Sequence, residues 1–436
     1  VTSDHIPIHI QIGSDIPKSS IFRFENYWSE FEGSYVTVVQ CWNRNQQLTN
    51  SAKDTAARFK CLRMGLKKWS KNLSKFNTNI SACNYVLPMI DGIEDQRNLS
   101  TIEANFRNIL KGHITKLLEV KRIYWKSRFK MRSIQLDDEN TEFFHAMATQ
   151  SYRKNFITSL PDEDGTPFQN HDHKAAIIWK SYKDRLGKAI NPPMLFNLEE
   201  IIQPKNLSEL EAPFSMDEID QVIKDIHSDR APGPDGFNGL FLKKCWNVIK
   251  QDIYTMIWDF FEGNIDIQSI NTAFITLIPK ITNPIDMNDF RPISLVSLPL
   301  KIITKLMANR AQKIITNVIH PNQYGFIKGR NIQDCLGYAF EYIHLCHQSR
   351  KPIIILKLDF EKAFDKIEYN AILNMLKAKG FGPRWINWVT NILNTASTSV
   401  LLNGVAGKKL YVKEESDKVI LTLPFYTLLP LISFSL

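Results

Sequence analysis

A chain of 436 residues would form about two or three domains. Its apolar fraction of 44% and charged fraction of 23% are ordinary for a globular protein, and they exclude collagen-like, mucin-like and wholly disordered classes. The formal net charge of +9 favours a polyanionic partner, although charge alone indicates no fold.

Six cysteines stand far apart and form no close Cys/His group, which argues against a disulfide framework or a structural zinc site. This usage favours a reducing location, nuclear or cytoplasmic. The chain starts at Val1 without the pattern of a secretory signal. Residues 419–436 are apolar enough for a short membrane span, but Pro424 and Pro430 interrupt them, and we expect no membrane association.

Apolar spacing predicts the elements of the first half. Alternation predicts a strand over residues 1–12, and helical spacing predicts helices over 51–76 and 102–133. Bases on the second helix interleave with aromatic residues, which is typical of a phosphate-backbone surface, although a solvated helix face explains the pattern equally well. These bases are Arg107, Lys111, Lys116, Lys121, Arg122, Lys126, Arg128, Lys130 and Arg132.

Four prolines predict a linker over residues 189–213, after which the apolar spacing becomes more regular. The elements expected beyond it are a helix over 217–226, turns over 230–236, a helix through Phe261, a strand over 273–278, helices over 301–319 and 337–348, and an apolar strand over 353–358.

Asp359 directly follows that apolar strand, and Asp365 comes six residues later, before a helix with Ile372 and Leu376 on its apolar side. A carboxylate at a strand end suits Mg²⁺, and two such ions can stabilise the attacking and departing oxygens of a phosphoryl transfer. Taken alone, the pair is explained more simply as acidic residues at the start of a helix.

The stretch 353–365 resembles the first palm motif of reverse transcriptases. Four blocks precede it in the order of that family, namely Ala231–Gly236, Leu277–Lys280, Phe290–Leu295 and Gln323–Arg330. Together they resemble the fingers and early palm of the polymerase of LINE-type, non-LTR retrotransposons, over residues 210–409. The resemblance implies RNA-directed DNA synthesis on a right-hand polymerase fold of the α+β class.

The resemblance also implies roles for single residues. Asp359 would bind Mg²⁺ with help from the Phe360 carbonyl, and the Phe364 ring would exclude a ribose 2′-hydroxyl. Arg291, supported by Lys280, would hold the incoming triphosphate. Asp365 would orient its helix, and the surface under the template would be shaped by Gly325, Gly329 and Arg330. The alternatives are a core position for Phe364 and a loop salt bridge for Arg291.

The implied partners are an RNA template, a DNA primer or target and deoxynucleotide triphosphates, with no obligate protein partner evident. Thr2–His5 resembles the last strand of the endonuclease/exonuclease/phosphatase fold, where Asp4 and His5 would serve a phosphate site whose other ligands are absent here. Phe22–Asn26 and Asn140–His145 resemble the linker region of plant elements, and we expect His145 to be structural.

The sequence departs from the family after Asn403–Lys409. Neither the expected Gly-Asp-Pro block nor Tyr/Phe-x-Asp-Asp follows, but the codons read one position out of register permit both Arg-Gln-Gly-Asp-Pro and Leu-Ala-Ala-Asp. We therefore expect an out-of-frame tail, from a frameshift or a missed splice, and no nucleotide incorporation by this chain. A non-catalytic nucleic-acid-binding remnant and a group II intron maturase are the alternatives.

The expected organisation has four segments. These are an endonuclease-like remnant over 1–20, a helical, basic spacer over 21–205, fingers and a partial palm over 206–409, and the apolar tail over 410–436.

Overall fold

A computed structural model describes residues 17, 19–44, 50–73, 76–129, 141–186, 197–325, 327–358 and 369–411. Helices predominate over two sheets, so the predicted α+β class is confirmed. The strand expected over 1–12 and the tail beyond residue 411 lie outside the described residues. None of the described helices combines the length and apolar character needed to cross a membrane.

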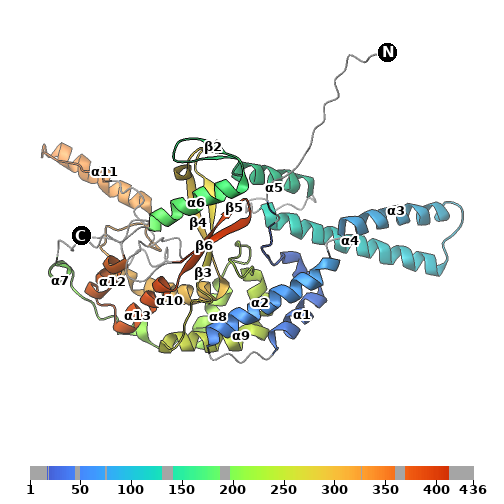
Figure 1. The fold of residues 1–436 in the computed structure, drawn as a ribbon, viewed down its shortest axis with the longest axis horizontal. Helices are drawn as coiled ribbons and strands as arrows, with labels where there is room; N and C mark the ends of the chain where they lie inside the picture. Colours follow the sequence, from blue (N-terminus) through green and yellow to red (C-terminus); the bar gives the residue numbers. More distant parts are fainter. Residues whose placement is uncertain are drawn as a thin grey trace, which may run out of the picture.

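The first half of the chain is mainly helical. Asn50 begins α2 by accepting a hydrogen bond from the Lys53 backbone, and α3 and α4 form a hairpin that projects from the body of the molecule (Figure 1). The elements of this half are η1 (Asn26–Glu30), α1 (Glu32–Trp42), α2 (Ser51–Trp69), η2 (Ser70–Asn72), α3 (Phe76–Glu94), α4 (Thr101–Phe129), α5 (Thr141–Asn155), β1 (Leu160–Pro161), β2 (Pro167–Phe168), α6 (His171–Leu186) and α7 (Leu198–Ile201).

The second half alternates helices with strands, largely where the sequence predicts them. Ser215 and Asn238 cap α8 and α9, and Gly263 ends α9 in the left-handed conformation. The elements are η3 (Ser208–Glu211), α8 (Met216–Asp225), α9 (Gly239–Glu262), β3 (Thr272–Pro279), η4 (Met287–Asp289), β4 (Phe290–Val296), α10 (Leu298–Val318), α11 (Ile332–Gln348), α12 (Tyr369–Ala378), α13 (Pro383–Asn394), β5 (Ser397–Leu402) and β6 (Val405–Tyr411).

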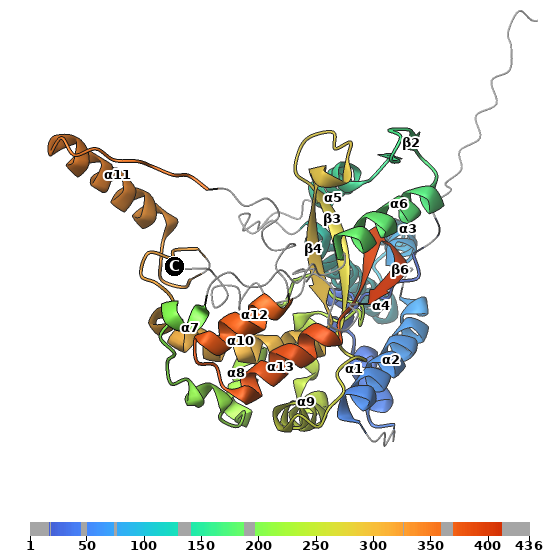
Figure 2. The same ribbon diagram turned by 60° about the vertical axis from the view of Figure 1, so that its left-hand side comes forward.

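The larger sheet has the strand order β4-β3-β5-β6, in which only the β3–β5 pair is parallel. Helix α6 lies alongside this sheet (Figure 2). Ile275 and Val400 are register partners, and both are buried in one cluster with Ile178 of α6. Because side chains alternate along a strand, the neighbouring residues Phe274 and Ser399 point to the opposite face.

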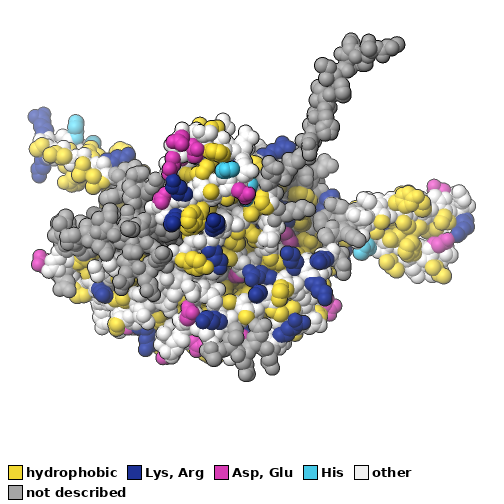
Figure 3. Space-filling view, viewed as in Figure 1, with side chains coloured by type: hydrophobic (Ala, Val, Ile, Leu, Met, Phe, Trp, Pro, Cys, Tyr) yellow, Lys and Arg dark blue, Asp and Glu magenta, His cyan; other side chains and the backbone are white. Residues whose placement is uncertain are grey.

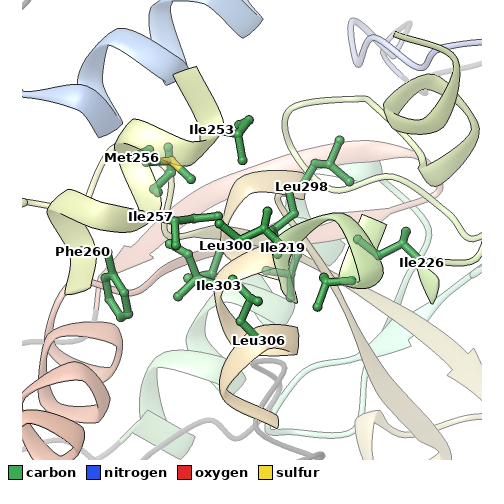
Figure 4. Close-up of a cluster of buried hydrophobic side chains, with 14 of the residues drawn as sticks. Ile219, Ile226, Ile253, Met256, Ile257, Phe260, Leu298, Leu300, Ile303 and Leu306 are labelled. Atoms are coloured by element: carbon green, nitrogen blue, oxygen red, sulfur yellow. The ribbon is translucent and has the colours of Figure 1, made fainter. Parts of the chain in front are cut away.

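One large hydrophobic core joins both halves of the chain. Around α8, α9 and α10 it contains Ile219, Ile257 and Leu306 (Figure 4). Buried residues of α1 and α2 belong to the same cluster, and the Trp42 indole N–H donates to Asp252 of α9 at 2.7 Å. Helices of the expected spacer and helices of the expected fingers therefore share one core.

The strand expected over residues 353–358 is absent, and this prediction was wrong. The segment follows α11 with no ladder partner among the described residues, and Ile354 is 97% exposed. An apolar run becomes a strand only where a neighbour takes up its backbone hydrogen bonds. The four described strands of the larger sheet pair with one another and provide no such neighbour here.

Candidate active site

The β3–β4 hairpin places Arg291 opposite Ile278 in an antiparallel ladder. The adjacent residue Phe290 is buried with Leu277, so alternation directs the Arg291 side chain to the face opposite α6. Arg291 is exposed and has no acidic partner within the described ranges. A guanidinium in this situation can donate several hydrogen bonds to phosphate oxygens.

Lys280 lies beside Arg291 at the end of the same hairpin. Its backbone N–H donates to the Asp289 carbonyl at 2.7 Å, and its ammonium group donates to the Asn288 carbonyl at 2.7 Å. Backbone N–H groups of Asp286 and Ile285 donate to the Asp289 carboxylate and lower its pKa. These bonds hold the turn in one conformation while Lys280 stays exposed.

The segment from His320 to Arg330 forms the entry to α11. The Arg330 guanidinium donates to the carbonyls of His320 at 2.8 Å and Gln323 at 2.6 Å, so it holds this loop together. Gly329 has φ +88°, a conformation that favours glycine, and Gly325 lies close to Gln323. The proposed template contacts of Arg330, Gly325 and Gly329 thus sit on an ordered turn, next to an open depression of about 620 Å³.

The Pro-Gly-Pro-Asp-Gly turn contributes a buried carboxylate that sequence analysis missed. Asp235 accepts hydrogen bonds from the backbone of Leu298, at the start of α10, and from Phe237. Burial raises the pKa of Asp235 to about 6, against the opposing effects of the Leu298 N–H and of the Lys301 charge. A β-carbon at Gly236 would collide with the Phe22 carbonyl, so the turn also fixes the start of the helical region.

The remaining candidates of the first palm motif lie outside the described residues. These are Asp359, Phe360, Phe364 and Asp365, together with Asp4, His5, Lys130 and Arg132 elsewhere in the chain. Across the described ranges, no group of three or more His, Cys, Asp or Glu side chains could hold a metal ion. The assignment of a metal to Asp359 therefore remains a prediction.

The basic helix α4 carries fewer unpaired cations than its sequence suggests. Arg107 pairs with Glu94 of α3, and Arg122 pairs with Glu119 at 2.6 Å. Arg128 pairs with Glu25 at 2.8 Å and lies over the Tyr124 ring. Each arginine is thus at least partly neutralised within the fold, which leaves Lys111, Lys116, Lys121 and Lys126 as the other predicted backbone contacts within the described part of α4.

Comparison with known proteins identifies the domain that these blocks form. The family model described as "Reverse transcriptase (RNA-dependent DNA polymerase)" matches residues 278–415. The chain carries a reverse transcriptase domain. The matched range includes the Phe290–Leu295 and Gln323–Arg330 blocks and the stretch 353–365, whereas the Ala231–Gly236 block lies before it.

Relatives of the reverse transcriptase domain come from mobile elements. The chain is 25% identical over 92% of its length to the transposon TX1 uncharacterized 149 kDa protein of Xenopus laevis. It is 29% identical over 40% of its length to the Pol polyprotein of the type-2 retrotransposable element R2DM of Drosophila melanogaster. It spans 31% and 16% of these two proteins, respectively. The predicted resemblance to non-LTR retrotransposon polymerases is therefore confirmed.

Reverse transcriptases as a family use divalent metal ions, an RNA or DNA template and nucleotide substrates. The match to TX1 extends across the helical region as well as the reverse transcriptase domain, since it covers 420 residues.

Proposed function

We propose that this chain is the polymerase part of a non-LTR retrotransposon protein that copies an RNA template into DNA. The proposal is carried by the family match over residues 278–415, which joins the Arg291 hairpin to the 353–365 motif in one domain. The substrates are deoxynucleotide triphosphates and a DNA primer or target. A nuclear or cytoplasmic location belongs to the proposal, because all six cysteines are free and fit a reducing compartment.

Four side chains have separate roles at the nucleotide. Arg291 binds the triphosphate oxygens, and Lys280 adds a second positive charge at the end of the same hairpin. Asp359 holds Mg²⁺, which would neutralise charge that develops on the phosphoryl oxygens. Phe364 restricts the space at the sugar and thereby selects deoxynucleotides.

We also propose that a polypeptide of these 436 residues does not incorporate nucleotides. These 436 residues contain no Tyr/Phe-x-Asp-Asp sequence. In this family the carboxylates of that motif would complete a two-metal site with Asp359. The out-of-frame interpretation of residues 410–436 explains this lack, and sequencing of the gene across codon 409 tests it. A locus without the hidden Gly-Asp-Pro block would contradict the interpretation.

Primer extension on an RNA template tests the function. The printed chain should give no more product than its Asp359→Ala variant, whereas a gene with the reading frame restored after Lys409 should give template-dependent DNA. In the restored chain, Arg291→Ala should raise the KM for deoxynucleotides about 10- to 100-fold, because charge-assisted hydrogen bonds contribute about 1.5–3 kcal/mol. Arg153→Ala on α5, the matched control, should leave KM unchanged.

Two results would contradict the proposal. Synthesis by the printed chain above the Asp359→Ala level would show that the tail does not abolish activity. A restored chain that binds RNA but extends no primer would instead favour the non-catalytic nucleic-acid-binding alternative.

A further inference from the structure

A cavity of about 210 Å³ lies between helix α2 and the larger sheet, and we refer to it as the α2 cavity. Phe59 and Arg63 line it from α2, whereas Phe274, Ser399 and Lys409 line it from strands β3, β5 and β6. The expected spacer and the reverse transcriptase domain thus build this cavity together.

Strand register places the α2 cavity on the same face of the sheet as Arg291. Ser399 pairs with both Phe274 and Lys409, so these three side chains share one face. Ile278 lies four residues beyond Phe274 on β3 and therefore points the same way, as does its partner Arg291. The two sites are about 13 Å apart along β3.

Helix α2 presents a stripe of cations beside the cavity. Lys60, Arg63 and Lys67 follow a spacing that places them on one side of the helix, and none forms a salt bridge in the part of the chain that the structure describes. The Arg63 charge acts on the Asp235 carboxylate, where it opposes the rise in pKa that burial causes. Lys53 and Arg58, by contrast, pair with Asp266 and with Asp54 and Asp252. Lysine and arginine side chains accordingly gather along the course of α2 (Figure 3).

Hydrogen bonds fix the geometry of the cavity. The Arg63 guanidinium donates to the Pro234 carbonyl at 2.8 Å, which positions the charge while its other N–H groups remain available. The carboxylate that lines the cavity, Asp235, is engaged by the backbone of Leu298 and Phe237. Even with this carboxylate ionised, the charges of Lys60, Arg63, Lys67 and Lys409 leave the net charge at the cavity positive.

Cations around a half-buried aromatic ring are the features that bind single-stranded nucleic acid without sequence preference. Arg63 and Lys409 supply the charges, and Phe274 supplies a ring at the cavity wall. A cavity of about 210 Å³ accommodates one sugar–phosphate unit or one base, not a base pair.

We propose that the α2 cavity and the Lys60–Arg63–Lys67 stripe bind the backbone of one nucleic-acid strand, with Arg63 and Lys409 as phosphate contacts. The α2 cavity lies on the sheet face that carries Arg291. The proposal therefore assigns part of the binding of the nucleic-acid strand to the expected spacer. The identification of the strand as the template rests on the proposed function.

Binding of a labelled single-stranded RNA to the full chain, measured by fluorescence anisotropy against salt, tests the proposal. Arg63→Gln retains a donor for the Pro234 carbonyl but removes the charge, and Lys409→Gln removes the second charge. Each should weaken binding about 3- to 10-fold and lower the salt slope by about 1. Lys68→Gln is the matched control on another side of α2 and should change binding less than about twofold.

Two comparisons complete the test. Arg63→Gln should weaken the binding of single-stranded DNA by the same factor as that of single-stranded RNA, whereas the binding of duplex RNA should not depend on Arg63. Unchanged melting temperatures establish that the variants are folded. If the wild-type chain binds RNA but Arg63→Gln and Lys68→Gln behave alike, the α2 cavity proposal is overturned and the polymerase proposal is untouched. If binding depends on Arg63 but the restored chain extends no primer, only the polymerase proposal fails.

Discussion

The α9 region and the α11 region both contain many apolar residues, but only those of α9 are buried. Phe241 at the start of α9 is fully buried, with its ring centroid 5.2 Å from Phe24 and 4.3 Å from Phe237. No residue of α11 is buried, and Phe340 on that helix is 70% exposed. The run 353–358 that follows α11 is equally exposed.

The difference shows which elements can form without neighbours. A helix satisfies its own backbone hydrogen bonds, so α11 forms although none of its residues is buried in the described structure. A strand depends on another strand for the same bonds, so the apolar run after α11 remains outside any ladder of the described strands. An apolar pattern therefore predicts a helix correctly, but it predicts a strand only where another strand lies close enough to pair with it.

Truncation of one phenylalanine in each region should give the largest contrast. Phe241→Ala removes a ring from the core shared by the two halves and should lower the free energy of unfolding by about 3–5 kcal/mol. Phe340→Ala is the matched change on α11 and should alter it by no more than about 0.5 kcal/mol. Urea unfolding followed by tryptophan fluorescence measures both.

Equal losses for the two variants would contradict the contrast, because they would place Phe340 in a packed environment. A small loss for Phe241→Ala would show that the helices of the first half do not contribute to one core with α9.

The buried carboxyl group of Asp235 should make the stability of the folded chain depend on pH. Because burial raises the pKa of Asp235 to about 6, above its usual 3.8, the folded state holds the proton more tightly than the unfolded state. Its contribution to stability is therefore present at low pH and is lost as pH rises through about 6. The loss should reach up to about 3 kcal/mol, since one pKa unit corresponds to about 1.4 kcal/mol.

Asp235→Asn tests this effect. The variant keeps an acceptor for the Leu298 N–H but cannot ionise, so its stability relative to the wild-type chain should rise between pH 4.5 and pH 7. Melting temperatures at the two pH values provide the measurement. A constant difference between the two chains would mean that Asp235 does not titrate in this window.

Sequence patterns predicted the local features of the fold and of the site. The helix over 217–226 and the strand over 273–278 follow from apolar periodicity and alternation. The burial of Asp235 depends on the approach of α10 and α2, which no local pattern encodes. Likewise, Arg128 looked like a free cation because its partner, Glu25, is about a hundred residues away in sequence.

The exposed apolar run should affect association more than stability. Ile354 is 97% exposed within a segment of β-branched and leucine residues, which is the composition of a strand able to pair with another chain. Ile354→Lys should reduce light scattering of concentrated protein at least about twofold and change the free energy of unfolding by no more than about 0.5 kcal/mol.

A control places the same charge outside the run. Ile281, 54% exposed after β3, belongs to the β3–β4 connection and not to residues 353–358, so Ile281→Lys should leave scattering close to that of the wild-type chain. If both variants reduce scattering equally, net charge rather than the run governs association. If only Ile354→Lys reduces it, residues 353–358 mediate the association between molecules. These are the residues that have no ladder partner among the described strands.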